Sequence, residues 1–126
     1  MTTSPMTTPT TTPTTTLTDY DRYRTGQLLF EQRRFDEAAR ELELLLGGNA
    51  PAYGLGEAPL LLARAYYHSA QLGRAETAAR GLLARDDTDG YAALLLGRTL
   101  QRRGRAAEAE TWLRRAAALG VDGSGS

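Results

Sequence analysis

Small and hydrophobic residues recur every three to four positions along residues 91–120, in two runs separated by a short polar turn. The first run follows the i, i+3, i+4, i+7 spacing of one helical face, with Ala93, Leu96, Gly97 and Leu100. The second run keeps the three-and-four spacing, with Ala109, Leu113, Ala116 and Ala117. The turn between them is Arg103-Gly104-Arg105. This pattern predicts a hairpin of two amphipathic helices.

The same hairpin pattern occurs twice more upstream. Each unit has a small residue on its first helix and an alanine twelve positions later: Gly26 and Ala38, Ala63 and Ala75, Gly97 and Ala109. Gly97 lies 34 residues after Ala63, which lies 37 residues after Gly26. A hairpin of about thirty residues cannot bury both of its faces alone, so we expect the copies to stack. The sequence therefore predicts an all-α chain of three helix-turn-helix units, with six helices.

The three units are expected at about residues 19–52, 56–89 and 90–120, within one domain that spans residues 19–120. In the first two units the helices are predicted at about 19–32, 35–47, 57–69 and 73–85. Asp19 and the acidic run 86–89 supply side chains that cap helix N-termini. The linker 47–59 is longer than its counterpart after the second unit, and we expect it to bulge outward without breaking the stack.

The two ends of the chain differ in composition from the repeats. Residues 1–18 are almost entirely Thr and Pro, which cannot bury apolar area, so a disordered tail is expected there. A modified, mucin-like stalk is the alternative interpretation of this segment. Residues 121–126, rich in Gly and Ser, are expected to form a flexible C-terminus.

Composition and charge disfavour several classes of protein. The 15 basic residues, all Arg, balance 15 acidic residues, whereas a nucleic-acid-binding protein usually shows a basic excess. Arg without Lys is typical of a GC-rich bacterial genome. No apolar run approaches the length of a membrane span, and the N-terminus lacks the features of a signal peptide. We therefore expect a cytoplasmic protein with no nucleic-acid or membrane partner.

Residues for catalysis or metal binding are scarce. His68 is the single histidine and there is no cysteine, so neither a multi-histidine metal site nor a Ser–His–Asp set can be argued. His68 itself is interpreted as a polar residue near a helix end. The acidic run 86–89 lacks the ligand spacing of a calcium loop and is interpreted as a turn and cap. The basic cluster 102–105 is interpreted as a solvated turn. The protein is not expected to be an enzyme or to bind a cofactor or metal.

The units resemble the tetratricopeptide repeat family, whose helix-turn-helix repeats are about 34 residues long with the pattern W-x2-L-G-x2-Y, then A-x3-F, then P. The third unit matches this pattern at Leu96-Gly97, Leu100, Ala109 and Leu113. The second matches at Leu62-Ala63, Tyr66 and Ala75, and the first at Gly26, Leu29, Ala38 and Leu42. The tryptophan slots depart from it, with Arg22, Pro59 and Ala93, as do the proline slots, with Ala50, Asp87 and Val121. The resemblance covers residues 19–120.

This resemblance implies a right-handed α-solenoid in which the first helix of each unit lines a concave groove. The residues that it assigns to peptide binding are Tyr23, Gln27, Phe30, Arg64, Tyr67, Tyr91, Arg98 and Arg102. Tyr20, Glu57, Leu60 and Leu94 are expected to accompany them. Aromatic and arginine side chains are enriched at such surfaces because they offer large contact areas and fork-shaped donors for carboxylates. The alternative is that the aromatic residues are partly core and that Arg64 pairs with a nearby glutamate.

Two functions follow as hypotheses. The first is a non-catalytic adaptor or scaffold that binds another protein through an extended, acidic peptide segment in the groove. The alternative is a structural protomer that self-associates weakly through the last unit, since no capping helix follows it, with contacts from Trp112, Leu113 and Ala117. The family's clamp for the carboxylate of chaperone tails is not expected, because its slots hold Tyr23, Gln27, Leu61, Tyr91 and Leu95.

Overall fold

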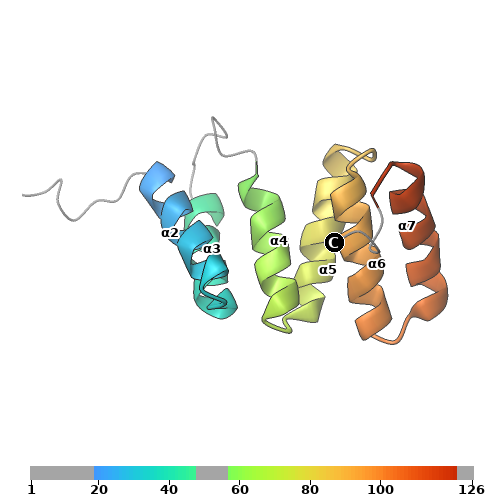
Figure 1. The fold of residues 1–126 in the computed structure, drawn as a ribbon, viewed down its shortest axis with the longest axis horizontal. Coiled ribbons are helices and arrows are strands. Elements are labelled where there is room, and N and C mark those ends of the chain that lie inside the picture. Colours follow the sequence, from blue (N-terminus) through green and yellow to red (C-terminus); the bar gives the residue numbers. More distant parts are fainter. Residues whose placement is uncertain (1–18, 48–56, 122–126) are drawn as a thin grey trace, which may run out of the picture.

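The computed structural model describes residues 19–47 and 57–121. Within these ranges the chain forms six α-helices and no strand (Figure 1): α2 Asp19–Glu31, α3 Phe35–Gly47, α4 Ala58–His68, α5 Leu72–Arg85, α6 Gly90–Arg102 and α7 Ala106–Ala118. The predicted all-α class and six helices are confirmed, with boundaries close to those expected. The predictions for the tail 1–18, for most of the linker 47–59 and for the end 122–126 lie outside the described residues.

The helices pack in chain order as three hairpins that stand side by side (Figure 1). Each helix contacts the next one along the chain, and α4 also contacts both α2 and α6. The first helices of the three units, α2, α4 and α6, therefore form a continuous row. These contacts establish the stacking of the hairpins, whereas the right-handed solenoid stays a prediction.

The two helices of the first and third hairpins approach closely where a glycine faces a leucine. A Cβ atom built on Gly97 would lie 2.5 Å from Leu113 Cδ2, and one built on Gly26 would lie 2.9 Å from Leu42 Cδ2. Ala109, which the sequence placed opposite Gly97, also lies close, with its carbonyl oxygen 3.3 Å from the same Cβ position. The side chain that covers the glycine is Leu113, one helical turn further on.

The middle hairpin solves the same packing problem with a different pair. Leu42, Ala79 and Leu113 each lie sixteen positions after the small residue of their unit. In the middle unit that small residue is Ala63, and both Ala63 and Ala79 are fully buried in one hydrophobic cluster. The two ends thus pair a glycine with a leucine, and the middle unit has two small residues at these positions, so both arrangements allow the helices to approach closely.

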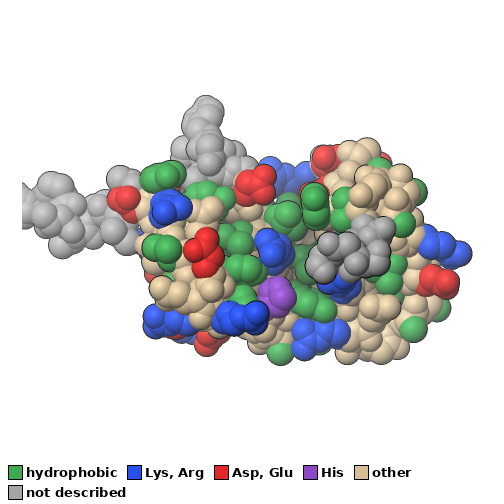
Figure 2. Space-filling view, viewed as in Figure 1, with side chains coloured by type: hydrophobic (Ala, Val, Ile, Leu, Met, Phe, Trp, Pro, Cys, Tyr) green, Lys and Arg blue, Asp and Glu red, His purple; other side chains and the backbone are tan. Residues whose placement is uncertain are grey.

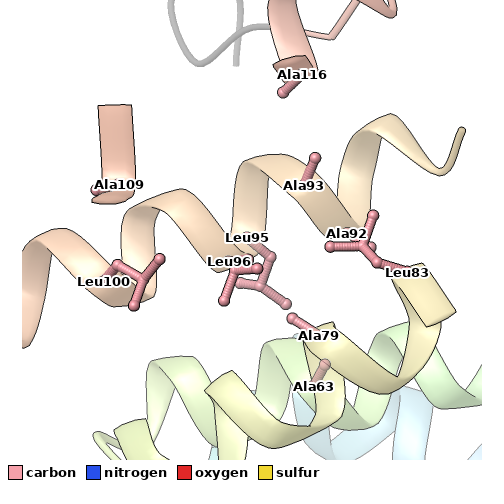
Figure 3. Close-up of a cluster of buried hydrophobic side chains, with 10 residues drawn as sticks. All are labelled: Ala63, Ala79, Leu83, Ala92, Ala93, Leu95, Leu96, Leu100, Ala109 and Ala116. Atoms are coloured by element: carbon pink, nitrogen blue, oxygen red, sulfur yellow. The ribbon is translucent and has the colours of Figure 1, made fainter. Parts of the chain in front are cut away.

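The largest part of the core surrounds α6, which lies between α5 and α7. Figure 3 shows Ala93 of α6 pointing toward Ala116 of α7, while Leu95 points toward Ala79 of α5. Eight of the thirteen residues of α6 are buried, more than in any other described helix. Burial on two sides explains why the sequence of α6 is rich in Leu and Ala around much of its circumference.

The turns within the three hairpins share one backbone geometry. In each, an amide donates to the carbonyl oxygen five residues back, for Arg34 to Leu29, Gln71 to Tyr66 and Arg105 to Leu100, at 2.8–2.9 Å. The residue before that amide has a positive φ angle: 63° at Arg33, 63° at Ala70 and 80° at Gly104. This left-handed conformation closes the helix and is unstrained only for glycine. The sequence predicted a turn between the two helices of each unit, but not the left-handed conformation of Arg33 and Ala70.

The acidic run before α6 acts as a helix cap, as predicted. Asp89 is the N-cap residue, and its side chain accepts a hydrogen bond from the Ala92 amide at 3.0 Å. Asp86 accepts from the amide and the hydroxyl of Thr88. Across the described ranges, no group of three or more His, Cys, Asp and Glu side chains is placed to hold a metal ion. None of the helices described has the length and apolar character needed to cross a membrane.

A network of ion pairs joins α5 to the last hairpin. Glu76 of α5, only 8% exposed, accepts hydrogen bonds from Arg80, Arg103 and Arg105, each at 2.9 Å. Burial opposes ionisation of Glu76, but the hydrogen bond from Arg80 and the nearby guanidinium charges outweigh it and lower its pKa. Arg80 and Arg105 also bind Glu108 of α7. The arginines of the turn 103–105, interpreted from sequence as solvated, are thus partly engaged in ion pairs.

Replacing Ala70 with glycine should stabilise the protein, because glycine adopts the left-handed conformation without strain. We expect the free energy of unfolding to rise by about 0.5–1 kcal/mol for Ala70→Gly and to fall by about 1 kcal/mol for Gly104→Ala. Urea denaturation measures both changes. The matched control is Ala84→Gly at an exposed helical position of α5, where the same substitution should lower stability. A stabilising Gly104→Ala would contradict the assigned turn geometry.

Candidate binding groove

Two surface hollows lie over the row formed by α2, α4 and α6. The larger, about 660 Å³, lies between α4 and α6, and the smaller, about 390 Å³, lies between α2 and α4. Glu57, Leu60 and Arg64 line both hollows, so the two form one groove across the three helices. Figure 2 shows hydrophobic side chains along the middle of this face, with basic side chains and the histidine among them.

Seven of the eight residues that the sequence assigned to the groove line these hollows: Tyr23, Gln27, Phe30, Arg64, Tyr67, Tyr91 and Arg98. The eighth, Arg102, stands beside the groove with its Cζ atom 4.9 Å from the centre of the Tyr67 ring. Its Nη1 atom also donates to the Tyr67 carbonyl oxygen at 3.1 Å. Tyr20 does not line either hollow and is 61% exposed. The structure thus brings the assigned residues together, while their role in binding stays a prediction.

Regular spacing along the helices puts these side chains on one face. On α4 and its N-cap, Glu57, Leu60, Arg64 and Tyr67 follow one another at intervals of three or four residues. Tyr91, Leu94 and Arg98 repeat this spacing on α6. Because both helices belong to equivalent positions of neighbouring units, their groove faces lie in line.

The aromatic residues form the floor of the groove and also contribute to the core. Tyr23 is 9% exposed and packs in a cluster with Leu42, Leu45 and Ala58. Phe30 and Tyr67 are half-buried against a neighbouring cluster. The alternative prediction of partly buried aromatics therefore agrees with the structure. Burial raises the pKa of the Tyr23 hydroxyl, and the nearby charge of Glu57 raises it further, so this phenol stays protonated at neutral pH.

Arg64 occupies the centre of the groove and makes no salt bridge within the described part of the chain. Its Cζ atom lies 4.8 Å from the centre of the Phe30 ring, a cation–π arrangement. The alternative prediction that Arg64 pairs with a glutamate is therefore not supported. A guanidinium that rests on an aromatic ring keeps its N–H groups available to a ligand.

His68 lines the larger hollow and Glu31 lines the smaller one, although the sequence assigned neither of them to the groove. His68 is the last residue of α4, as interpreted, but its imidazole joins a cluster of aromatic rings. The ring is stacked on Phe35 at 4.7 Å between centroids, and it makes edge contacts with Phe30 at 5.6 Å and Tyr67 at 5.3 Å. The available signal was its position, four residues after Arg64 and 34 residues before Arg102.

The charges in the groove are distributed unevenly along the helices. Glu57 and Asp89 are the N-cap residues of α4 and α6, whereas His68 and Arg102 are the last residues of these helices. Burial lowers the pKa of His68, and the positive charges of Arg64, Arg102 and Arg33 lower it further. The imidazole is therefore neutral at pH 7. The groove has an acidic edge at the N-termini of α4 and α6 and a basic edge at the C-termini of these two helices, while Glu31, the last residue of α2, adds an acidic side chain to the smaller hollow.

The residues assigned to self-association lie only partly at the surface. Leu113 and Trp112 are half-buried, because Leu113 packs on Gly97 and Trp112 packs against the largest core cluster. The Cζ atom of Arg115 also lies over the Trp112 ring, at 5.4 Å. Ala117 is exposed. The apolar surface that the sequence predicted at the end of the stack is therefore smaller than expected, and its role in self-association stays a prediction.

Comparisons with protein-family models, with curated proteins and with solved structures found no match to this chain. The resemblance to the tetratricopeptide repeat family therefore rests on the residues quoted from the sequence.

Protonation of His68 should destabilise the folded protein. Because its folded-state pKa lies below the ordinary value of 6.5, the unfolded chain binds the proton more readily. The contribution of His68 to stability is thus fully present above about pH 6.5 and is lost as the pH falls from that value through the lower folded-state pKa. Urea denaturation between pH 5 and 7.5 should show this loss in the parent protein and a smaller one in His68→Phe. If the free energy of unfolding fell equally with pH in the two proteins, the assigned environment of the His68 imidazole would be contradicted.

Proposed function

We propose that this chain is a non-catalytic protein-interaction module of the tetratricopeptide repeat type. In this proposal it binds an extended, acidic peptide segment of another protein in the groove across α2, α4 and α6. The observation that carries the proposal is the position of Arg64, which lies unpaired at the centre of an aromatic groove between two hollows. A cytoplasmic location and a bacterial source belong to the same proposal.

The size of the groove suits a short extended segment. Packed helices lie about 8–10 Å apart, so a groove across three of them spans about 16–20 Å. An extended chain advances about 3.3 Å per residue, so about six residues would fit. The aliphatic side chains Leu60 and Leu94 line the larger hollow and offer a surface for one or two apolar side chains of the ligand.

The basic edge would select acidic side chains. Arg64 and Arg98 lie 34 residues apart in equivalent positions of α4 and α6, and both line the larger hollow. Guanidinium groups bind carboxylates through paired N–H donors. Glu57 and Asp89 on the opposite edge would repel the same carboxylates. A ligand would therefore turn its acidic side chains toward the C-terminal ends of the helices.

Self-association through Trp112, Leu113 and Ala117 remains the alternative proposal. It is less well supported, because two of these side chains are turned partly into the last hairpin. The groove and the outer face of α7 use different residues, so mutations in one leave the other intact.

Reversing both groove arginines should abolish peptide binding. We expect acidic peptides selected from a seven-residue display library to bind the parent protein and to lose at least a hundredfold in affinity for Arg64→Glu/Arg98→Glu. Each charge-assisted contact contributes about 1.5–3 kcal/mol, and each tenfold loss corresponds to about 1.4 kcal/mol. Fluorescence anisotropy measures the affinities, and circular dichroism checks that the helices are retained.

The matched control is Arg40→Glu/Arg114→Glu, which makes the same change in charge at two exposed positions that do not line the groove. It should bind as the parent does. An equal loss in both double variants would mean that total charge, not the groove, governs binding. Unchanged affinity in the groove variant would place the site elsewhere on the molecule.

A further inference from the structure

Three arginines lie around His68, close enough for their charges to act on its imidazole, while Glu31, the last residue of α2, lines the smaller hollow together with Arg64. Arg33 comes from the first turn, Arg64 from α4 and Arg102 from the end of α6, so each of the three units contributes one. None of them makes a salt bridge within residues 19–47 and 57–121. Some arginines elsewhere in the described structure are held by acids, as Arg22, Arg34, Arg80, Arg103 and Arg105 are, whereas others, such as Arg40 and Arg114, make no salt bridge there.

Two of these guanidinium groups lie over aromatic rings that contact His68. Arg64 lies over the Phe30 ring, Arg102 lies over the Tyr67 ring, and both rings make edge contacts with the imidazole. A guanidinium has five N–H donors, and Arg102 uses one of them on the Tyr67 carbonyl oxygen. Most N–H donors of Arg64 and Arg102 therefore remain available to a ligand. Because the rings already restrict these two side chains, binding would cost them less conformational entropy.

The electrostatics of His68 indicate that this cluster lacks negative charge. After burial, the causes that lower its pKa are the charges of Arg64, Arg102 and Arg33, and no carboxylate opposes them. The α3 residue packed on the imidazole is Phe35, which carries no charge. A bound anion with several oxygen atoms would offset this excess of positive charge.

We propose that Arg33, Arg64, His68 and Arg102 bind the phosphoryl group of a phosphorylated side chain in the peptide that occupies the groove. This inference rests on the proposed function and names a ligand class for the basic edge. A phosphomonoester carries a charge of about −1.5 to −2 at pH 7 and three acceptor oxygens. A carboxylate offers one charge and two oxygens, and it would leave most of these donors unused. Phosphorylation of the partner would therefore switch binding on.

The single histidine makes the site directly observable, because one imidazole signal in the proton NMR spectrum belongs to His68 alone. The probes are three blocked peptides with a central phosphoserine, aspartate or serine between leucines, together with inorganic phosphate. We expect the phosphoserine peptide to shift the His68 signal and to raise the pKa of His68, since a nearby dianion favours the protonated ring. It should bind at least tenfold more tightly than the aspartate peptide, and inorganic phosphate more weakly still.

Neutral substitutions separate the roles of the arginines. Arg64→Gln/Arg102→Gln should lose at least tenfold in affinity for the phosphoserine peptide, while Arg40→Gln/Arg114→Gln, exposed and outside the groove, should lose nothing. His68→Phe, which preserves an aromatic ring against Phe35, should weaken phosphopeptide binding and lower the ratio of phosphoserine to aspartate peptide affinity. Helical circular dichroism confirms folding of each variant.

Four outcomes would overturn the inference. The first is equal affinity for the phosphoserine and aspartate peptides, and the second is phosphopeptide binding that leaves the His68 signal unmoved. The third is inorganic phosphate that binds as tightly as the phosphoserine peptide. The fourth is a short oligonucleotide, whose phosphates are all diesters, that binds more tightly than the phosphoserine peptide. The first would leave the proposed function standing, provided that Arg64→Glu/Arg98→Glu abolishes aspartate peptide binding. Failure of every peptide, phosphorylated or not, to bind the groove would instead overturn the proposed function itself.

Discussion

The structure depends on how closely the two helices of each hairpin can approach. Gly26 faces Leu42, Gly97 faces Leu113, and a Cβ atom on either glycine would overlap the leucine side chain. Ala63 and Ala79 take the same positions in the middle unit. A hairpin closed in this way buries its small residues completely and presents its remaining apolar surface to the next unit. Stacking of the three units follows, because no hairpin of this size can cover both of its faces by itself.

The groove is a consequence of that stacking. Close hairpins place α2, α4 and α6 in one row, and the three-to-four spacing of each helix turns its aromatic and basic residues to the same side. On α5 and in the turn between α6 and α7, basic residues serve a different purpose, since Arg80, Arg103 and Arg105 are held by Glu76. The arginines thus include a set held in ion pairs between helices, such as Arg80, and two at the groove, Arg64 and Arg102, that make no salt bridge within the described residues.

Features set by local periodicity could be predicted from the sequence, and features set by tertiary contacts could not. The helices, the small-residue positions and the face that carries Tyr67 or Arg98 follow from spacing along one chain segment. The stacking of His68 on Phe35 joins α4 to α3, and no local pattern indicates it. The left-handed turn at Ala70 was missed because alanine gives no signal for it. Leu113 was expected to contribute to an exposed apolar surface at the end of the stack, but its side chain packs on Gly97 within the last hairpin.

A double-mutant cycle between Gly97 and Leu113 tests the closing contact most directly. Gly97→Ala should lower the free energy of unfolding in the parent protein, because the added methyl group overlaps Leu113. In a Leu113→Ala background the same substitution should cost much less, since the overlapping side chain is gone. The account predicts a coupling of about 1 kcal/mol or more in urea denaturation, within the range seen for contacting residues. Costs that add to within about 0.5 kcal/mol would contradict it, because residues without mutual contact behave in that way.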